Sequence, residues 1–251
     1  MKIEAPAKVN LILNILGKRE DGYHEVEMLM QAIDLCDTVE VTSAKGTGIW
    51  ISAPGAQLNC GPSNLAYKAA ELMLKEFNKQ EHVNVTIEKR IPIAGGLGGG
   101  SADAAAVINL LAKIWGIKDN EKLMAIGAKL GSDVPFCIAA QQGKTCAIAR
   151  GTGTDLEFVP SPNIKVELKI FNILVKNKTK AVYSELKPED YAVRYDIQKF
   201  LNAPTLAEKE ALMGNNLQAA AFRVFEREGF KMPDYPKHLS GAGPTLFAVV
   251  E

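Results

Sequence analysis

The alternation of apolar and polar side chains predicts several β-strands. Residues 8–16 alternate polar and apolar positions before running apolar, which is typical of a half-buried strand. Other segments are rich in β-branched residues and are bounded by Gly, Pro or Asn, as antiparallel strands commonly are. These further predicted strands cover residues 37–44, 48–53, 83–90, 165–175 and 245–250.

Apolar residues spaced three and four positions apart predict helices. One such helix covers residues 63–79, where Ser63 or Asn64 is placed to cap the N-terminus. Further helices are expected over residues 101–115 and 120–130, and two or three more between the last two strands. Strands crossed by single helices favour an α+β fold.

A division into two domains is indicated by a cluster of turn-forming residues at positions 150–163. We therefore expect an N-terminal domain over residues 1–155 and a C-terminal domain over residues 156–251. The second of these is short for a domain with its predicted number of elements.

The composition adds little specificity. The 251 residues are 47% hydrophobic, and 29 basic side chains balance 29 acidic ones, so nothing in the net charge favours nucleic acid or a membrane surface as a partner. No signal peptide, transit peptide or membrane span is expected. The cysteines form no CxxC pair, and we expect reduced thiols in the cytoplasm at Cys36, Cys60, Cys137 and Cys146.

The most informative segment is a glycine-rich loop in front of a predicted helix. Five of the six positions from Gly95 to Gly100 are glycine, and Leu97 is the exception. A loop without Cβ atoms lets a ligand approach the backbone closely, and the N-terminus of a helix offers unpaired N–H groups to an anion. A glycine-rich turn without a ligand remains the alternative. The combination predicts phosphate binding.

Two common phosphate loops do not fit this spacing. A Walker A loop requires a lysine before the Ser or Thr, but Gly100 precedes Ser101 directly. The GKT sequence that begins at Gly143 has Ile138 in place of the first glycine. The dinucleotide fingerprint fails because Ser101 occupies the position of its third glycine.

Residues 92–105, PIAGGLGGGSADAA, resemble the glycine-rich motif of the GHMP kinase superfamily, to which galactokinase, homoserine kinase and mevalonate kinase belong. Two further segments match that superfamily in chain order: APAKVNLIL at residues 5–13 and LSGAGPTLF at residues 239–247. The resemblance implies a two-domain GHMP kinase fold, with an N-terminal ribosomal protein S5-like domain and a C-terminal ferredoxin-like α/β sandwich. It also implies ATP as phosphate donor.

Within the superfamily, residues 6–41 resemble the branch that phosphorylates a cytidyl diphosphate sugar alcohol, a small-molecule substrate. The resemblance implies that Asp133 and Lys8 form the catalytic pair, with Asp133 as the base. From the residues alone, Asp133 could equally cap a turn, and Lys8 could lie on the surface of an edge strand. Lys8 and Asn10 are two positions apart, so on a strand both point to the same face, and we expect Asn10 to bind substrate.

The predicted substrate-binding residues are Tyr23, His24 and Tyr183. The resemblance implies that His24 reads a cytosine edge while Tyr23 stacks on the base, with Tyr183 as the opposite wall. The sequence Asp21-Gly22 is also a strong turn signal, so a hairpin with an exposed aromatic is the alternative for Tyr23. Tyr183 could be ordinary helix packing.

On the nucleotide side, the resemblance implies that the loop cradles the ATP phosphates while Asn64 and Lys89 line the adenine pocket. Ser101 is also expected to cap the following helix. ATP implies Mg²⁺, but no cluster of carboxylates identifies its ligands, and Asp103 either approaches the metal or favours the helix dipole. The expected phosphate-loop residues are Gly95, Gly96, Gly98, Gly99, Gly100 and Ser101.

Some features depart from the superfamily pattern. Ala102 stands where a second serine is common, and the chain continues only a few residues beyond the third motif, so we expect a shortened C-terminal domain. Two rival functions remain open. One is a GHMP kinase with another small acceptor, and the other is a non-catalytic nucleotide sensor on the same fold. The sequence leaves monomer and homodimer equally open.

Overall fold

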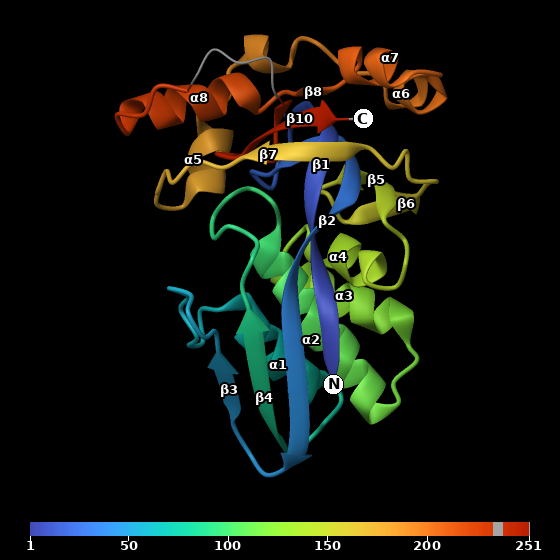
Figure 1. Ribbon diagram of the computed structural model, residues 1–251, viewed down its shortest axis with the longest axis vertical. Coiled ribbons are helices and arrows are strands. Elements are labelled where there is room, and N and C mark those ends of the chain that lie inside the picture. The colour runs from blue at the N-terminus through green and yellow to red at the C-terminus, as the bar shows by residue number, and fades with distance from the viewer. Residues whose placement is uncertain (233–237, 251) are drawn as a thin grey trace. The chain divides into compact units, whose positions relative to one another are not determined.

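A computed structural model describes residues 1–232 and 238–250, and the chain divides into two compact units. Two long strands, β1 (Lys2–Lys18) and β2 (His24–Lys45), contribute to both units (Figure 1). Unit 1 comprises Met1–Ala7, Asp34–Ile93 and Gly98–Thr145, and unit 2 comprises Lys8–Ile33, Ala94–Leu97 and Cys146–Glu251.

The turn between β1 and β2 follows the expected hairpin chemistry. Gly22 has φ +85°, which only glycine adopts without strain, and the carboxylate of Asp21 accepts a hydrogen bond from the N–H of Tyr23. The carbonyl of Tyr23 in turn accepts the N–H of Arg19 at 2.8 Å. The turn signal of Asp21-Gly22 is therefore confirmed, and a role of Tyr23 in substrate binding stays a prediction.

Unit 1 is a small sheet covered by helices. Strand β4 (Glu81–Glu88) pairs antiparallel with residues 38–45 of β2, and β3 (Ile49–Ser52) runs parallel to β4. Helix α1 packs on β3 and β4 and also on α2, whose small side chains, including Ala102 and Ala105, are fully buried. The helices are α1 (Leu65–Glu76), α2 (Gly99–Trp115), α3 (Asn120–Leu130) and α4 (Val134–Ala140).

Unit 2 contains two groups of strands. Residues 26–31 of β2 pair antiparallel with β5, β5 pairs with β6, and β1 pairs in parallel with β8. In the second group β10 pairs antiparallel with both β7 and β9. The strands are β5 (Cys146–Gly151), β6 (Asp155–Phe158), β7 (Lys165–Lys169), β8 (Gly214–Asn215), β9 (His238–Leu239) and β10 (Leu246–Val250).

Short helices complete unit 2, and α5 packs on α8. They are α5 (Lys178–Ser184), the 3-10 helix η1 (Pro188–Tyr191), α6 (Ile197–Asn202), α7 (Leu206–Ala211) and α8 (Gln218–Arg227).

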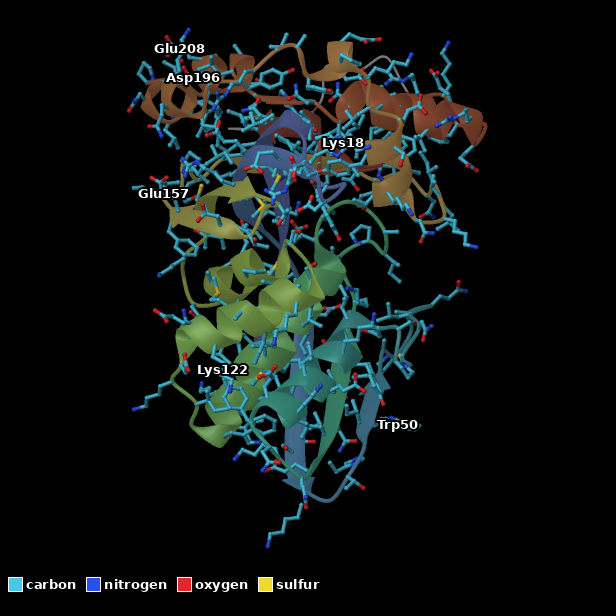
Figure 2. The ribbon with its side chains drawn as sticks, turned by 180° about the vertical axis from the view of Figure 1, so that it is seen from behind. Lys18, Trp50, Lys122, Glu157, Asp196 and Glu208 are labelled. Carbon is cyan, nitrogen blue, oxygen red and sulfur yellow. The ribbon has the colours of Figure 1, made fainter. Side chains whose placement is uncertain are left out.

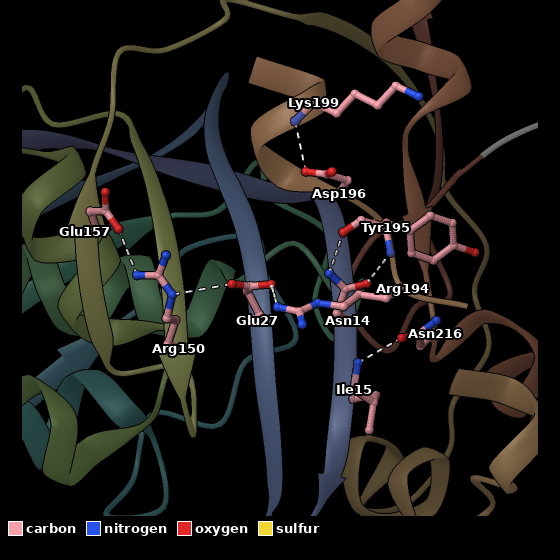
Figure 3. Close-up of polar contacts among 10 residues, drawn as sticks. All are labelled: Asn14, Ile15, Glu27, Arg150, Glu157, Arg194, Tyr195, Asp196, Lys199 and Asn216. Atoms are coloured by element: carbon pink, nitrogen blue, oxygen red, sulfur yellow. Dashed lines mark hydrogen bonds and ion pairs between the residues drawn. The ribbon is translucent and has the colours of Figure 1, made fainter. Parts of the chain in front are cut away.

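Polar contacts fasten the segment before α6 to the strands of unit 2 (Figure 3). The side-chain amide of Asn14 donates to the carbonyl of Tyr195 and accepts from its N–H, both at 2.8 Å. Glu27 accepts from Arg194 at 2.8 Å and also pairs with Arg150. Because buried backbone groups need partners, Asn14 fixes this segment more firmly than the half-exposed ion pairs do.

Most predicted elements are confirmed, with boundaries shifted. The helix expected from residue 101 begins at Gly99, so Ser101 lies inside its first turn, and the prediction that Ser101 caps it is wrong. The predicted linker contains β6, and α4, which was not predicted, has Pro135 as its second residue. The division at residue 155 stays a prediction.

Among the described residues, no helix is long and apolar enough to span a membrane. Two of the charged side chains labelled in Figure 2 contact their own unit: Lys122 donates to the carbonyl of Glu76, and Glu208 accepts from Thr205. The exposed ring of Trp50 extends from β3 in the same view.

Candidate active site

The three sequence motifs meet in unit 2. The N–H of Lys8, in the first motif, donates to the carbonyl of Leu97 in the glycine-rich loop at 2.9 Å. The N–H of Thr245, in the third motif, donates to the carbonyl of Gly95 at 3.1 Å, and the hydroxyl of Ser240 donates to the carbonyl of Gly96 at 3.0 Å. Segments far apart in the chain thus form one hydrogen-bonded assembly.

Gly96 is required by the close approach of these loops. Its φ is +82°, and a Cβ atom there would lie 2.5 Å from the carbonyl oxygen of Ser240 and 2.7 Å from that of Gly243. Both distances are below any real Cβ contact, and the opposing atoms are backbone. The second and third motifs therefore fit together only with glycine at this position.

The predicted residues Lys8 and Asn10 lie side by side on β1. The ammonium of Lys8 donates to Oδ1 of Asn10 at 2.7 Å, and the two residues are 4% and 1% exposed. The Asn10 amide also lies 3.3 Å from Sδ of Met28. A Cβ on Gly241 would lie 3.6 Å from Asn10 Oδ1 and 3.7 Å from Lys8 Nζ, which places the third motif directly beside the pair. The same-face prediction is confirmed.

Asn215 positions the third motif and was missed by the sequence analysis. Its side-chain amide donates to the carbonyls of Leu239 at 2.9 Å and Gly241 at 2.8 Å, and its Oδ1 accepts the N–H of Leu217. The residue is 7% exposed. No sequence signal marks it, because Gly214-Asn215-Asn216 reads as a turn signal.

In unit 1 the glycine-rich loop leads into α2 without a side-chain cap. The N-cap is Gly98, with φ +73°, and its place in the left-handed region suits glycine. Within the described residues, this 17-residue helix has no side-chain hydrogen bond that caps its N-terminus. Such a terminus suits an anion, because its N–H groups and the helix dipole both favour negative charge.

A buried ionic cluster supports the ends of this loop in unit 1. Lys89 pairs with Asp37 and, at 2.8 Å, with Asp103, and Oδ1 of Asp37 also accepts the N–H groups of Arg90 and Ile91. Burial raises the pKa of Asp103 to about 7, against the opposing effect of Lys89, and Oδ1 of Asp103 has no hydrogen-bond partner among the described residues. The role of Lys89 in an adenine pocket stays a prediction.

Asp133 and Asn64 also belong to unit 1. Asp133 immediately precedes α4 and is half-buried, and its side chain does not cap that helix. Asn64 caps α1 by accepting the N–H of Ala66 at 2.8 Å, as expected from its spacing. Its place in the adenine pocket and the meeting of Asp133 with Lys8 of unit 2 stay predictions.

The predicted substrate residues lie together in unit 2. The rings of His24 and Tyr183 have centroids 5.2 Å apart, in a tilted arrangement. Burial, and to a smaller extent the charge of Lys18, lower the pKa of His24, which favours the neutral ring. Tyr23 is 66% exposed, so most of this residue is accessible to solvent. The contact between His24 and Tyr183 is compatible both with ordinary packing of the helix face and with a role of Tyr183 in substrate binding, so that role stays a prediction.

No cluster of three or more His, Cys, Asp or Glu side chains that could hold a metal ion occurs within residues 1–232 and 238–250. Two acidic residues of unit 1, Asp37 and Asp103, are already paired with Lys89.

Comparison with known proteins agrees with this architecture. The GHMP kinases N terminal domain matches residues 64–141, and the mixed α and β elements with three converging motifs define a GHMP-type kinase. Over 99–100% of its length the chain is 37% identical to a 4-diphosphocytidyl-2-C-methyl-D-erythritol kinase of Geobacter sulfurreducens, covering 90% of it, and 33% identical to one of Acaryochloris marina, covering 86%. The chain belongs to the 4-diphosphocytidyl-2-C-methyl-D-erythritol kinase family and is therefore a kinase, which implies the use of ATP.

Solved structures give the same result. A crystal structure of 4-(cytidine 5'-diphospho)-2C-methyl-D-erythritol kinase is 33% identical, with a TM-score of 0.81 over 100% of this chain and 90% of that one. The mevalonate kinase of Methanococcus jannaschii is 17% identical, with a TM-score of 0.68 over 100% of this chain and 90% of that one, and shows the shared fold alone.

Proposed function

We propose that the protein transfers the γ-phosphate of ATP to the 2-hydroxyl of 4-diphosphocytidyl-2-C-methyl-D-erythritol, in the non-mevalonate route to isoprenoid precursors. The observation that carries the proposal is the buried pair of Lys8 and Asn10 beside the glycine motifs. The full-length similarity to kinases named for this acceptor supports the choice of substrate.

The transfer needs a base and a fixed acceptor. Asp133 takes the proton of the substrate's 2-hydroxyl while the hydroxyl oxygen attacks the γ-phosphorus of ATP. The bond between the γ-phosphorus and the β–γ bridging oxygen breaks, and ADP leaves. The ammonium of Lys8, held by Asn10, orients the hydroxyl and stabilises the negative charge of the moving group. This step requires Asp133 and Lys8 to meet around the bound substrates.

The glycine-rich loop receives the phosphates through backbone amides, and Asn64 and Lys89 line the adenine pocket. The use of ATP implies Mg²⁺, which commonly relies on substrate phosphates and few carboxylates, so the chain itself would supply few of its ligands. When bound, the ion neutralises phosphate charge.

Cytosine recognition explains the aromatic residues at the acceptor end. Tyr23 and Tyr183 offer two faces for stacking, and the neutral ring of His24 offers hydrogen bonds to the base edge. We place the enzyme in the reducing cytosol, where its four free cysteines would stay as thiols.

The test is ADP formation with 4-diphosphocytidyl-2-C-methyl-D-erythritol, mevalonate and homoserine offered separately, using the wild type and Asp133→Asn. We expect turnover with the cytidyl substrate alone and a loss of about 10²- to 10⁴-fold in the variant. Turnover with another acceptor would replace the proposed substrate. ATP binding without turnover on any acceptor would instead favour the sensor function.

A further inference from the structure

Lys178, at the start of α5, contacts both glycine motifs of unit 2. Its ammonium donates hydrogen bonds to the carbonyl of Ala94, which directly precedes Gly95, and to the carbonyl of Gly243 in the third motif. These contacts place a positive charge at the junction where Gly96 packs against Ser240 and Gly243.

This charge is poorly compensated in the protein as described. The carbonyls are neutral, and no carboxylate of the described residues forms an ion pair with Lys178. Burial therefore lowers the pKa of Lys178 to about 8. A cation that is partly buried without an opposite charge is stabilised when an anion binds beside it.

The glycine-rich loop itself carries no cation. Phosphate loops of the Walker type include a lysine that reaches the terminal phosphates, and Gly95 to Ser101 contains none. The ammonium of Lys178 donates to the carbonyl of Ala94, directly before this loop. From that position it can supply the positive charge that the loop lacks.

We propose that Lys178 is a phosphate-binding residue that supplies to the glycine-rich loop, from outside the loop, the positive charge for the terminal phosphates of ATP. The proposal rests on the proposed function only in taking ATP as the ligand. It does not depend on the acceptor.

Binding of nucleotides by calorimetry tests this role without any turnover. In Lys178→Met we expect the affinity for a non-hydrolysable ATP analogue to fall about 10- to 100-fold, by analogy with a charge-assisted contact, while the affinity for adenosine stays unchanged. Lys178→Arg should recover part of the loss. Lys176→Met, at an exposed lysine two residues earlier, is the matched control and should bind like the wild type.

A proton-uptake measurement isolates the charge. At pH 8.5 part of Lys178 is neutral, and phosphate binding raises its pKa, so the wild type should take up a fraction of a proton per ATP analogue bound. Calorimetry in buffers of different ionisation enthalpy reports this uptake, and we expect it to be absent in Lys178→Met.

The outcomes separate the possible roles. Equal losses for the ATP analogue and adenosine, with a lower melting temperature of the free protein, would mean that Lys178 only fastens the two loops. Unchanged affinity and unchanged proton uptake would overturn the proposal outright. The two proposals can also be told apart. If Lys178→Met loses affinity for the ATP analogue but not for adenosine, while the wild type does not phosphorylate the cytidyl acceptor, this proposal stands and only the proposed substrate is refuted.

Discussion

The hydroxyl of Ser240 donates a hydrogen bond to the carbonyl of Gly96 across 144 positions of the chain. This bond joins the third glycine motif to the second, where the backbones approach too closely for any Cβ atom. The fit of these two loops is the basis for the first prediction.

Gly96→Ala should destabilise the protein by about 3 kcal/mol or more, because it combines a strained φ with a clash against backbone. Gly22→Ala is the matched control, since Gly22 has φ +85° with nothing within 4 Å of its Cβ position. We expect the control to cost only about 1 kcal/mol. Urea unfolding measures both, and equal losses would show that the loops can separate.

Lys8→Met should lower kcat about 10²- to 10³-fold, because it removes the positive charge beside the reacting group. The dissociation constant of ATP should change only a few-fold. Lys2→Met, at an exposed lysine on the same strand, is the control and should leave kcat unchanged. A wild-type kcat in Lys8→Met would remove this residue from the mechanism.

Tyr23→Ala should raise KM for the cytidyl acceptor about 10- to 100-fold, the usual cost of losing one stacked base, and leave KM for ATP unchanged. Trp50→Ala provides a control of equal exposure, because both side chains are 66% exposed. Steady-state kinetics with each substrate varied in turn makes the comparison. An equal change in both KM values would contradict a role in cytosine binding.

Asn215→Ala should reduce the free energy of unfolding by about 1–3 kcal/mol, because buried carbonyls of Leu239 and Gly241 lose their donor. The exposed Asn172→Ala should have little effect. Since the same carbonyls belong to the third motif, ATP affinity should fall together with stability. If Asn215→Ala loses stability but keeps the ATP affinity of the wild type, the third motif does not contribute to nucleotide binding.

The titration of Asp103 gives a pH prediction. Its pKa is about 7 in the folded state and 3.8 for the ordinary group, so between these values the folded state binds more protons than the unfolded state. The contribution of Asp103 to stability must therefore fall as the pH rises from about 4 to about 7. Asp103→Asn should lack this component.

Urea unfolding at pH 5 and pH 8 measures the difference between wild type and Asp103→Asn. We expect the wild type to lose more stability than the variant on going to pH 8. The exposed Asp155→Asn should behave like the wild type. Identical pH dependence in all three proteins would show that Lys89 keeps Asp103 ionised throughout.

The local sequence pattern was sufficient to predict much of the local structure of this protein. The hairpin at Gly22, the cap by Asn64 and the shared face of Lys8 and Asn10 depend on neighbouring residues and on the fixed periods of strands and helices, so they were predictable from sequence. The local pattern wrongly predicted that Ser101 caps α2, because this helix begins two residues earlier, at Gly99, with Gly98 as its N-cap. It also failed for α4.

The sequence by itself determined most of the elements, the glycine-rich loop and the family resemblance, because each depends on short segments or on their order in the chain. Only the tertiary structure decided which distant groups meet. It brought Lys178 to the carbonyls of Ala94 and Gly243, and it brought Asn215 to the third motif. Contacts of this kind depend on how the chain packs, and the sequence next to Lys178 or Asn215 carries no sign of the partners that packing gives them.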